Sequence, residues 1–144
     1  MEKFIGITMG DPTGIGPEII VKVLAKNLPN LKVYGSLDIL LKTAKDLGLS
    51  FNPNLVDDIS LTKNDIDSIK IGSPSRASGL LSYNFIEKAV KDCLSGKIKA
   101  LVTGPISKYA WRLANINFPG HTELLASLSN FNSSPEVRML CILV

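Results

Sequence analysis

A turn rich in glycine and proline, residues 9–18 with the sequence MGDPTGIGPE, lies directly between two apolar stretches of this chain. The preceding run, residues 4–8, is short and rich in β-branched side chains, which predicts a buried strand. Pro17 suits the first turn of a helix, where its missing N–H costs nothing, and Glu18 suits the positive end of a helix. The turn is therefore expected to join a strand to a helix. Its backbone N–H groups would then face a space beyond the strand end, a geometry that suits a phosphate or another anion.

Strands and helices are expected to alternate through the rest of the first half. Residues 31–35 form the next apolar run and predict a second strand. Ser36 then suits a helix N-cap, and Gly48 suits a helix end. The two helices are expected to bury apolar stripes, which are Ile19, Ile20, Val23 and Leu24 in the first and Ile39, Leu40, Ala44 and Leu47 in the second.

The second half repeats this pattern after a polar stretch. Residues 52–78 have no clear hydrophobic period and predict a connecting segment with room for one short strand. A long amphipathic helix is expected from Ser78 to Gly96. Its apolar face would consist of Leu81, Phe85, Ala89 and Leu94. Residues 99–103 predict a further strand.

A second turn with glycine and proline, residues 104–108, follows that strand and precedes a helix through Trp111. The alternation of strands and helices predicts an α/β fold whose sheet is at least partly parallel and is covered by helices. Ligands of open α/β sheets bind beyond the carboxyl ends of the strands. We therefore expect the two turns to line a single crevice.

The composition excludes several classes of function. A chain of 144 residues with 45% hydrophobic and 20% charged residues can bury one core, so we expect one domain or most of one. The net charge of +3 is spread without a basic block, which argues against a nucleic-acid partner. No apolar run has the length of a membrane span or the context of a signal peptide, and the cysteines form no paired motif. A soluble protein of a reducing cytoplasm is expected.

Two interpretations of the first turn stay open at this level. The dinucleotide fingerprint requires a third glycine where the chain has Ile19, and no P-loop sequence is present. The turn is thus either a binding site of another kind or only a tight strand-to-helix connection. Asp11 has the same two interpretations, because its carboxylate could contact a substrate hydroxyl or could close an Asx turn.

Three residues of the second half are further candidates for a binding site. Lys108 follows the second turn, where its ammonium could reach a phosphate or a carboxylate. His121 is the only histidine and lies in a Pro-Gly turn before an apolar helix, where Thr122 is a candidate N-cap. A surface lysine and a lone histidine are also common structural residues, and a single histidine with two distant cysteines cannot form a His/Cys metal cluster. No Gly-x-Ser-x-Gly motif supports a hydrolase.

Three stretches together resemble the N-terminal part of the 4-hydroxythreonine-4-phosphate dehydrogenase family. They are GDPTGIGPE at residues 10–18, LVTGPISK at residues 101–108 and FPGHTE at residues 118–123, in that order. The resemblance extends from about residue 5 to the last residue and corresponds to less than half of the family's usual length. It implies a three-layer α/β fold like that of isocitrate and isopropylmalate dehydrogenases, of which residues 1–144 would be the N-terminal part of a two-subdomain enzyme.

The resemblance also implies a function for this truncated chain. The family oxidises 4-phosphooxy-L-threonine with NAD or NADP and a divalent metal on the way to pyridoxal 5'-phosphate, usually as a homodimer. The matching substrate-binding positions are His121 and Thr122, with Lys108 facing the same cleft; Asp11 is a further candidate from its place in the turn. A related dehydrogenase for threonate or erythronate phosphate shares these motifs. A non-catalytic phosphate-binding module or gene remnant is the third hypothesis.

The resemblance assigns no catalytic, cofactor-binding or metal-binding residue to any position of this chain. The family's metal ligands are histidines from a later segment and from across the dimer interface, and its cofactor segment is also later. We therefore expect residues 1–144 alone to be inactive, because hydride transfer needs both groups. The apolar run at residues 137–144 predicts one more buried strand whose neighbours lie beyond this sequence.

Overall fold

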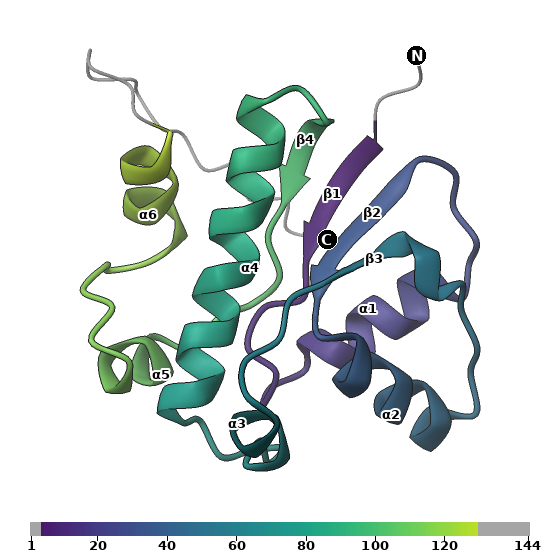
Figure 1. The fold of residues 1–144 in the computed structure, drawn as a ribbon, viewed down its shortest axis with the longest axis horizontal. Helices are drawn as coiled ribbons and strands as arrows, with labels where there is room; N and C mark the ends of the chain where they lie inside the picture. The colour runs from purple at the N-terminus through teal and green to yellow at the C-terminus, as the bar shows by residue number, and fades with distance from the viewer. Residues whose placement is uncertain (1–3, 130–144) are drawn as a thin grey trace, which may run out of the picture.

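The structure is a computed structural model that describes residues 4–129. Four parallel strands form one sheet in the order β3-β2-β1-β4, which confirms the predicted α/β class and the parallel sheet (Figure 1). The strands are β1 (Phe4–Thr8), β2 (Leu31–Gly35), β3 (Val56–Asp58) and β4 (Ile98–Val102). The last strand begins one residue before the predicted range, and the three-residue β3 occupies the place left for a short strand.

Helices connect every pair of successive strands, as parallel strands require. They are α1 (Gly16–Leu24), α2 (Leu37–Leu47), α3 (Lys63–Asp67), α4 (Arg76–Leu94), α5 (Lys108–Leu113) and α6 (His121–Leu128), with a 3-10 turn, η1 (Pro53–Leu55), before β3. Right-handed crossovers place α1 and α2 on one face of the sheet and α4 on the other, because the chain moves from β1 to β2 but returns to the far side of β1 to make β4. Among residues 4–129, none of these helices combines the length and the apolarity needed to cross a membrane.

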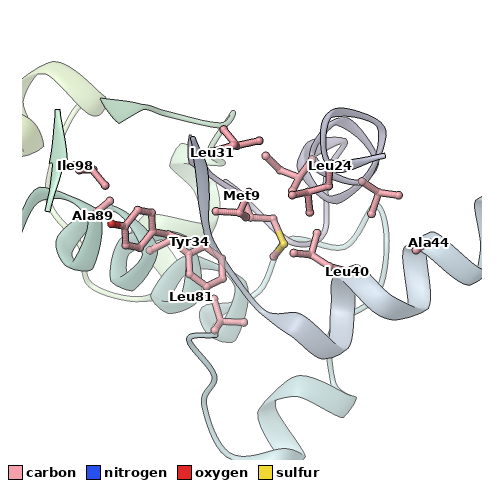
Figure 2. Packing of buried hydrophobic residues seen from close by; sticks show 13 residues of the cluster. Met9, Leu24, Leu31, Tyr34, Leu40, Ala44, Leu81, Ala89 and Ile98 are labelled. Carbon is pink, nitrogen blue, oxygen red and sulfur yellow. The ribbon is translucent and has the colours of Figure 1, made fainter. Parts of the chain in front are cut away.

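The main core lies on both faces of the sheet. Figure 2 shows Leu24 and Leu40 near α1 and α2, whereas Tyr34, Leu81 and Ala89 lie beside α4. The buried members of this cluster are Met9, Ile20, Val21, Leu24, Leu31, Val33, Tyr34, Leu40, Ala44, Leu81, Phe85, Ala89 and Ile98. A second, smaller cluster is formed by Ile86, Val90, Trp111 and Leu124, and it joins α4 to α5 and α6.

Most residues of the predicted apolar stripes are at least partly buried. The prediction is wrong for three residues at the ends of these stripes, which are exposed. Ile19 is 42% exposed because the buried face of α1 is formed by Pro17, Ile20, Val21 and Leu24, and Ile19 lies on the other side of the helix. Leu47 and Leu94, the last residues of α2 and α4, are also exposed. Both lie in the final helical turn.

Helix ends follow the local sequence signals only in part. Gly48 ends α2 in the left-handed conformation, with φ 64°, as predicted. Ser36 occupies the N-cap position of α2, but its side chain makes no capping hydrogen bond, and its buried Oγ has no hydrogen-bond partner among the described residues. Helix α3 has no counterpart among the predicted elements; it begins after Thr62, whose Oγ1 accepts a hydrogen bond from the Asp65 N–H. The strand predicted at residues 137–144 lies outside the described residues.

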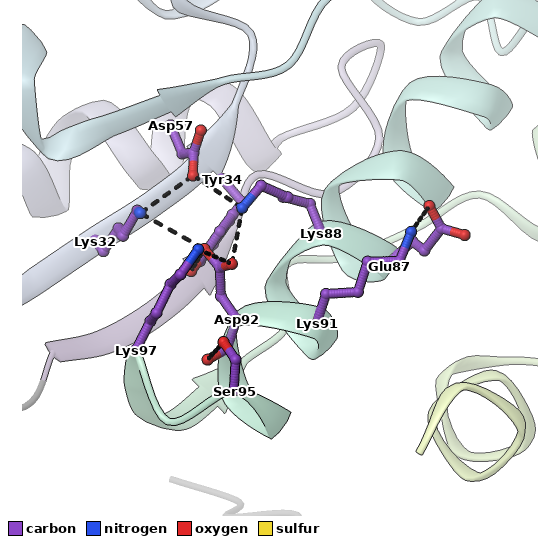
Figure 3. Close-up of polar contacts among 9 residues, drawn as sticks. All are labelled: Lys32, Tyr34, Asp57, Glu87, Lys88, Lys91, Asp92, Ser95 and Lys97. Carbon is purple, nitrogen blue, oxygen red and sulfur yellow. Dashed lines mark hydrogen bonds and ion pairs between the residues drawn. The ribbon is translucent and has the colours of Figure 1, made fainter. Parts of the chain in front are cut away.

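One buried carboxylate links α4 to the sheet (Figure 3). Asp92 is buried, and its Oδ1 accepts hydrogen bonds from Lys88 Nζ at 2.8 Å and Lys97 Nζ at 3.3 Å. The Tyr34 hydroxyl, from β2, donates to Asp92 Oδ2 at 3.0 Å. Lys32 Nζ lies 3.6 Å from the same oxygen. Burial by itself would raise the pKa of Asp92, but the hydrogen bonds from Lys88, Tyr34 and Lys97 lower it to about 2.

Candidate functional site

The two glycine- and proline-containing turns contact each other at the carboxyl ends of β1 and β4. The Asp11 N–H donates to the Pro105 carbonyl at 2.8 Å, and the Gly104 N–H donates to the Thr8 carbonyl at 3.1 Å. The Gly104 N–H also lies 3.1 Å from the Thr8 hydroxyl oxygen. Because β2 lies on one side of β1 and β4 on the other, this edge is the topological switch point of the sheet. Such points are the usual ligand sites of open α/β sheets.

Glycine is required at this contact for two separate reasons. Gly10 has φ 78°, and a Cβ at this position would overlap the Pro105 carbonyl oxygen. A Cβ on Gly104 would lie 2.8 Å from the Met9 carbonyl oxygen. The glycines therefore allow the two turns to touch, in addition to shaping each turn.

Asp11 closes the first turn from inside. Its Oδ1 accepts hydrogen bonds from the Thr13 N–H at 2.7 Å and from the Thr13 hydroxyl at 2.6 Å. The residue is 3% exposed, and its Oδ2 has no hydrogen-bond partner among residues 4–129. Of the two roles left open by the sequence, the Asx turn is the one that the structure contains. Contact between Asp11 and a substrate stays a prediction.

A hollow of about 420 Å³ follows the second turn and brings together the other three candidate residues. It is lined by Pro105, Ile106, Lys108, Pro119, Gly120, His121, Thr122 and Glu123. Lys108 is the first residue of α5, whose N-cap, Ser107, accepts a hydrogen bond from the Ala110 N–H at 3.1 Å. Lys108 is exposed and forms no ion pair with any other residue in the described range. Its ammonium is thus available to an anion in the hollow.

His121 is held in place by the end of β4. Its Nε2 lies 3.2 Å from the Gly104 carbonyl oxygen. Because a carbonyl oxygen only accepts hydrogen bonds, Nε2 must carry the proton in this contact. Burial lowers the pKa of His121, and the Gly104 hydrogen bond opposes this effect without cancelling it. The lowered pKa favours the neutral imidazole, whose unprotonated Nδ1 can then accept a hydrogen bond.

Thr122 has a different local role from the predicted one. Helix α6 begins at His121, and its N-cap is Gly120, whose carbonyl accepts the first helical hydrogen bond, from the Leu124 N–H at 3.3 Å. The prediction of Thr122 as N-cap is wrong, because the extended backbone at Gly120 lets the helix start two residues earlier. Thr122 lies in the first helical turn and still lines the hollow.

The single crevice lined by both turns stays a prediction, because two hollows beside the turns are each lined by one turn only. The first turn contributes Pro12 and Gly14 to a separate hollow of about 490 Å³. The remaining lining residues of this hollow come from the start of α1, from α2 and from residues 66–71. The two turns therefore touch each other but line different hollows. The sequence pattern did not predict this second hollow. The one sequence feature that could have indicated it is the group of apolar residues Ile66, Ile69 and Ile71, which lie in a segment predicted to be a connection.

The residues that the structure describes do not fit a metal site. Within the described part of the chain, no group of three histidine, cysteine, aspartate or glutamate side chains is placed to hold a metal ion. The one histidine already uses Nε2 for the Gly104 carbonyl. The first turn likewise does not fit a dinucleotide, because Ile19, in the place of the third glycine of the fingerprint, carries a side chain.

Comparisons with known proteins agree on one family. The family described as "Pyridoxal phosphate biosynthetic protein PdxA" matches residues 22–142. A 4-hydroxythreonine-4-phosphate dehydrogenase from Synechocystis is 36% identical over 138 residues, which are 88% of this chain and 39% of that protein. A D-threonate 4-phosphate dehydrogenase from Salmonella typhimurium is also 36% identical, over 146 residues, which are 89% of this chain and 44% of that protein.

The comparison with solved structures indicates the same family. The crystal structure of a 4-hydroxythreonine-4-phosphate dehydrogenase from Klebsiella pneumoniae matches with a TM-score of 0.77 and 34% identity, over 88% of this chain and 44% of that one. The chain thus spans about two fifths of the length of the relatives it matches.

Proposed function

This chain belongs to the family of pyridoxal phosphate biosynthetic proteins called PdxA, and we propose that it is the N-terminal part of a dehydrogenase that oxidises a phosphorylated hydroxy acid. The preferred substrate is 4-phosphooxy-L-threonine, in the synthesis of pyridoxal 5'-phosphate. The observation that carries the proposal is the grouping of Lys108, His121 and Thr122 around one hollow at the switch point of the sheet.

The chemistry of the hollow suits such a substrate. The Lys108 ammonium supplies a fixed positive charge for the phosphate or the carboxylate. The Thr122 hydroxyl can donate to an anionic oxygen, and the unprotonated Nδ1 of His121 can accept a hydrogen bond from a substrate hydroxyl or ammonium group. In this proposal these residues bind and orient the substrate, and no proton or hydride step is assigned to them.

The other parts of the enzyme are proposed to come from outside this chain. NAD or NADP accepts the hydride and a divalent metal polarises the reacting oxygen in this class of reaction. We place both sites in a later segment, within a two-subdomain, three-layer fold like that of isocitrate and isopropylmalate dehydrogenases. A homodimer in the cytoplasm is part of the same proposal.

The first test is an activity measurement on the 144-residue chain. We expect no reduction of NAD or NADP with 4-phosphooxy-L-threonine and Mg²⁺, Mn²⁺ or Zn²⁺, because the described residues supply neither a metal site nor a dinucleotide site. The measurement is the absorbance of the reduced nicotinamide, with a full-length relative as the positive control. Turnover by the short chain would contradict the proposal.

The second test is substrate binding at Lys108. Lys108→Met is expected to weaken the binding of 4-phosphooxy-L-threonine about tenfold, since one charge-assisted contact contributes about 1.4 kcal/mol. Titration calorimetry on the 144-residue chain measures this change. Lys42→Met is the matched control, because Lys42 lines the other hollow. An equal loss with both variants would show a general charge effect and would contradict the assignment.

A second candidate substrate follows from the comparisons. The relative named D-threonate 4-phosphate dehydrogenase has the same 36% identity as the one named for 4-hydroxythreonine-4-phosphate. The two substrates differ at C2, where the threonine derivative carries an amino group and the threonate carries a hydroxyl group. A competition titration of both ligands against the wild-type chain decides between them, and tighter binding of the threonate would move the proposal to the second candidate.

A further inference from the structure

Helix α5 contributes to the hollow at one end and to the core at the other. Lys108, its first residue, lines the hollow, whereas Trp111, one turn later, is fully buried. Trp111 belongs to the cluster that joins α4 to α5 and α6. The Trp111 side chain therefore connects the helix that carries Lys108 to this core.

The orientation of the Trp111 ring is fixed by α4. Its Nε1–H donates to the Ser82 hydroxyl oxygen at 2.9 Å, and the Ser82 hydroxyl donates to the Gly79 carbonyl at 3.0 Å. The backbones of the two helices are also in close contact at this point, since a Cβ on Gly79 would overlap the Ala110 carbonyl oxygen. A buried tryptophan with a satisfied N–H has little freedom to rotate.

The same ring packs against His121. The two ring centroids lie 6.1 Å apart and the planes meet at 66°, an edge-to-face arrangement. The His121 ring therefore has one hydrogen bond, to the Gly104 carbonyl at the end of β4, and one aromatic contact, to Trp111 on α5. These two contacts come from different elements, and together they define the plane of the imidazole.

We propose that Trp111, anchored by Ser82, is a positioning residue of the substrate site, which holds the His121 ring and the Lys108 turn of α5 in one fixed arrangement. The proposal rests on the proposed function for its role in binding. It does not require Trp111 to touch the substrate, because it acts through His121 and through the helix that carries Lys108. The plain alternative is that Trp111 is only a core residue.

Two variants separate these interpretations. Ser82→Ala keeps the tryptophan side chain but removes the hydrogen-bond acceptor that fixes its position, while Trp111→Phe keeps an aromatic ring and removes the N–H donor. Both are expected to admit water beside His121 and so to raise its pKa toward the ordinary value, because burial is what lowers it. His121 is the only histidine, so its imidazole signals in an NMR titration are unambiguous. Lys108 and Glu123, the charged residues of the same hollow, are unchanged in both variants.

The binding measurement completes the test. Both variants are expected to weaken the binding of 4-phosphooxy-L-threonine to the 144-residue chain three- to tenfold. Val21→Ala, in the main core and away from α5, is the control for a general loss of stability. It is expected to lower the melting temperature while leaving the His121 titration and the affinity unchanged.

Each outcome has a distinct meaning. If Ser82→Ala and Trp111→Phe lose stability but keep the wild-type His121 titration and affinity, the positioning role is overturned and Trp111 is a core residue. If the wild-type chain does not bind the phosphorylated acid, the proposed function fails. The His121 titration, which needs no substrate, then still decides whether Trp111 positions the imidazole.

Discussion

Gly10→Ala is expected to destabilise the fold by about 3 kcal/mol or more, because the added side chain meets two separate obstacles. The backbone of Gly10 is in the left-handed region at φ 78°, where a Cβ costs about 1–2 kcal/mol. The added Cβ would also overlap the Pro105 carbonyl oxygen, which belongs to the backbone of the second turn and has no rotamer to change. The two turns would have to separate. Chemical denaturation of the wild-type and variant chains measures the difference.

Gly48→Ala is the matched control for this prediction. Gly48 has a similar φ of 64°, but apart from its chain neighbours and its own helix no atom of residues 4–129 lies within 4 Å of the position of a Cβ. Its substitution is expected to cost only about 1–2 kcal/mol, the conformational cost alone. Equal losses of unfolding free energy at Gly10 and Gly48 would mean that the contact between the two turns contributes nothing to stability. This result would contradict the prediction for Gly10.

Asp92→Asn is expected to destabilise the fold by about 2–3 kcal/mol at pH 7. Asp92 is buried, and hydrogen bonds from Lys88, Tyr34 and Lys97 lower its pKa from 3.8 to about 2, despite a desolvation that acts in the opposite direction. The asparagine keeps the shape of the side chain but removes the charge that these donors share. Asp46→Asn is the control, because Asp46 is exposed and has no ion pair among the described residues. A loss below about 0.5 kcal/mol at Asp92 would contradict the assignment.

The same carboxylate predicts how stability depends on pH. Because the pKa of Asp92 is lower in the folded chain, its contribution is complete above the unfolded value of 3.8 and is lost as the pH falls toward about 2. The difference in unfolding free energy between wild type and Asp92→Asn should therefore be constant near neutral pH and should shrink between about pH 4 and pH 2. Urea denaturation at a series of pH values measures this difference. A gap that stays constant down to pH 2 would exclude Asp92 as its source.

Much of the fold could be predicted because the local signals agreed with one another. Pro17 at a helix start and Gly48 at a helix end lie where local sequence rules place them. The wrong predictions concern residues whose burial depends on whether another helix or strand packs over them. Ile19 and Leu94 continue apolar stripes in the sequence, yet they are exposed because no described element covers those positions.

The candidate site could be predicted only as separate residues. Lys108 and His121 stand out from their turns, but spacing alone could not show that they line one hollow. The Asx turn of Asp11 was one of two open roles, and the choice required the distance from its Oδ1 to Thr13. The second hollow was missed because its walls come from three segments that are distant in sequence.

The sequence by itself determined the order of the strands and of the helices other than α3, the two glycine turns and the family of this protein, because these depend on local backbone preferences and on short motifs. The tertiary structure alone decided the strand order that makes β1 the switch point and the direct contact of Gly10 with the second turn. It also decided the environment of His121, whose pKa is lowered by burial and whose Nε2 is held by one carbonyl 17 residues away in the chain. The physical reason is that burial and charge state depend on which segments pack together in space, and a local pattern does not contain that information.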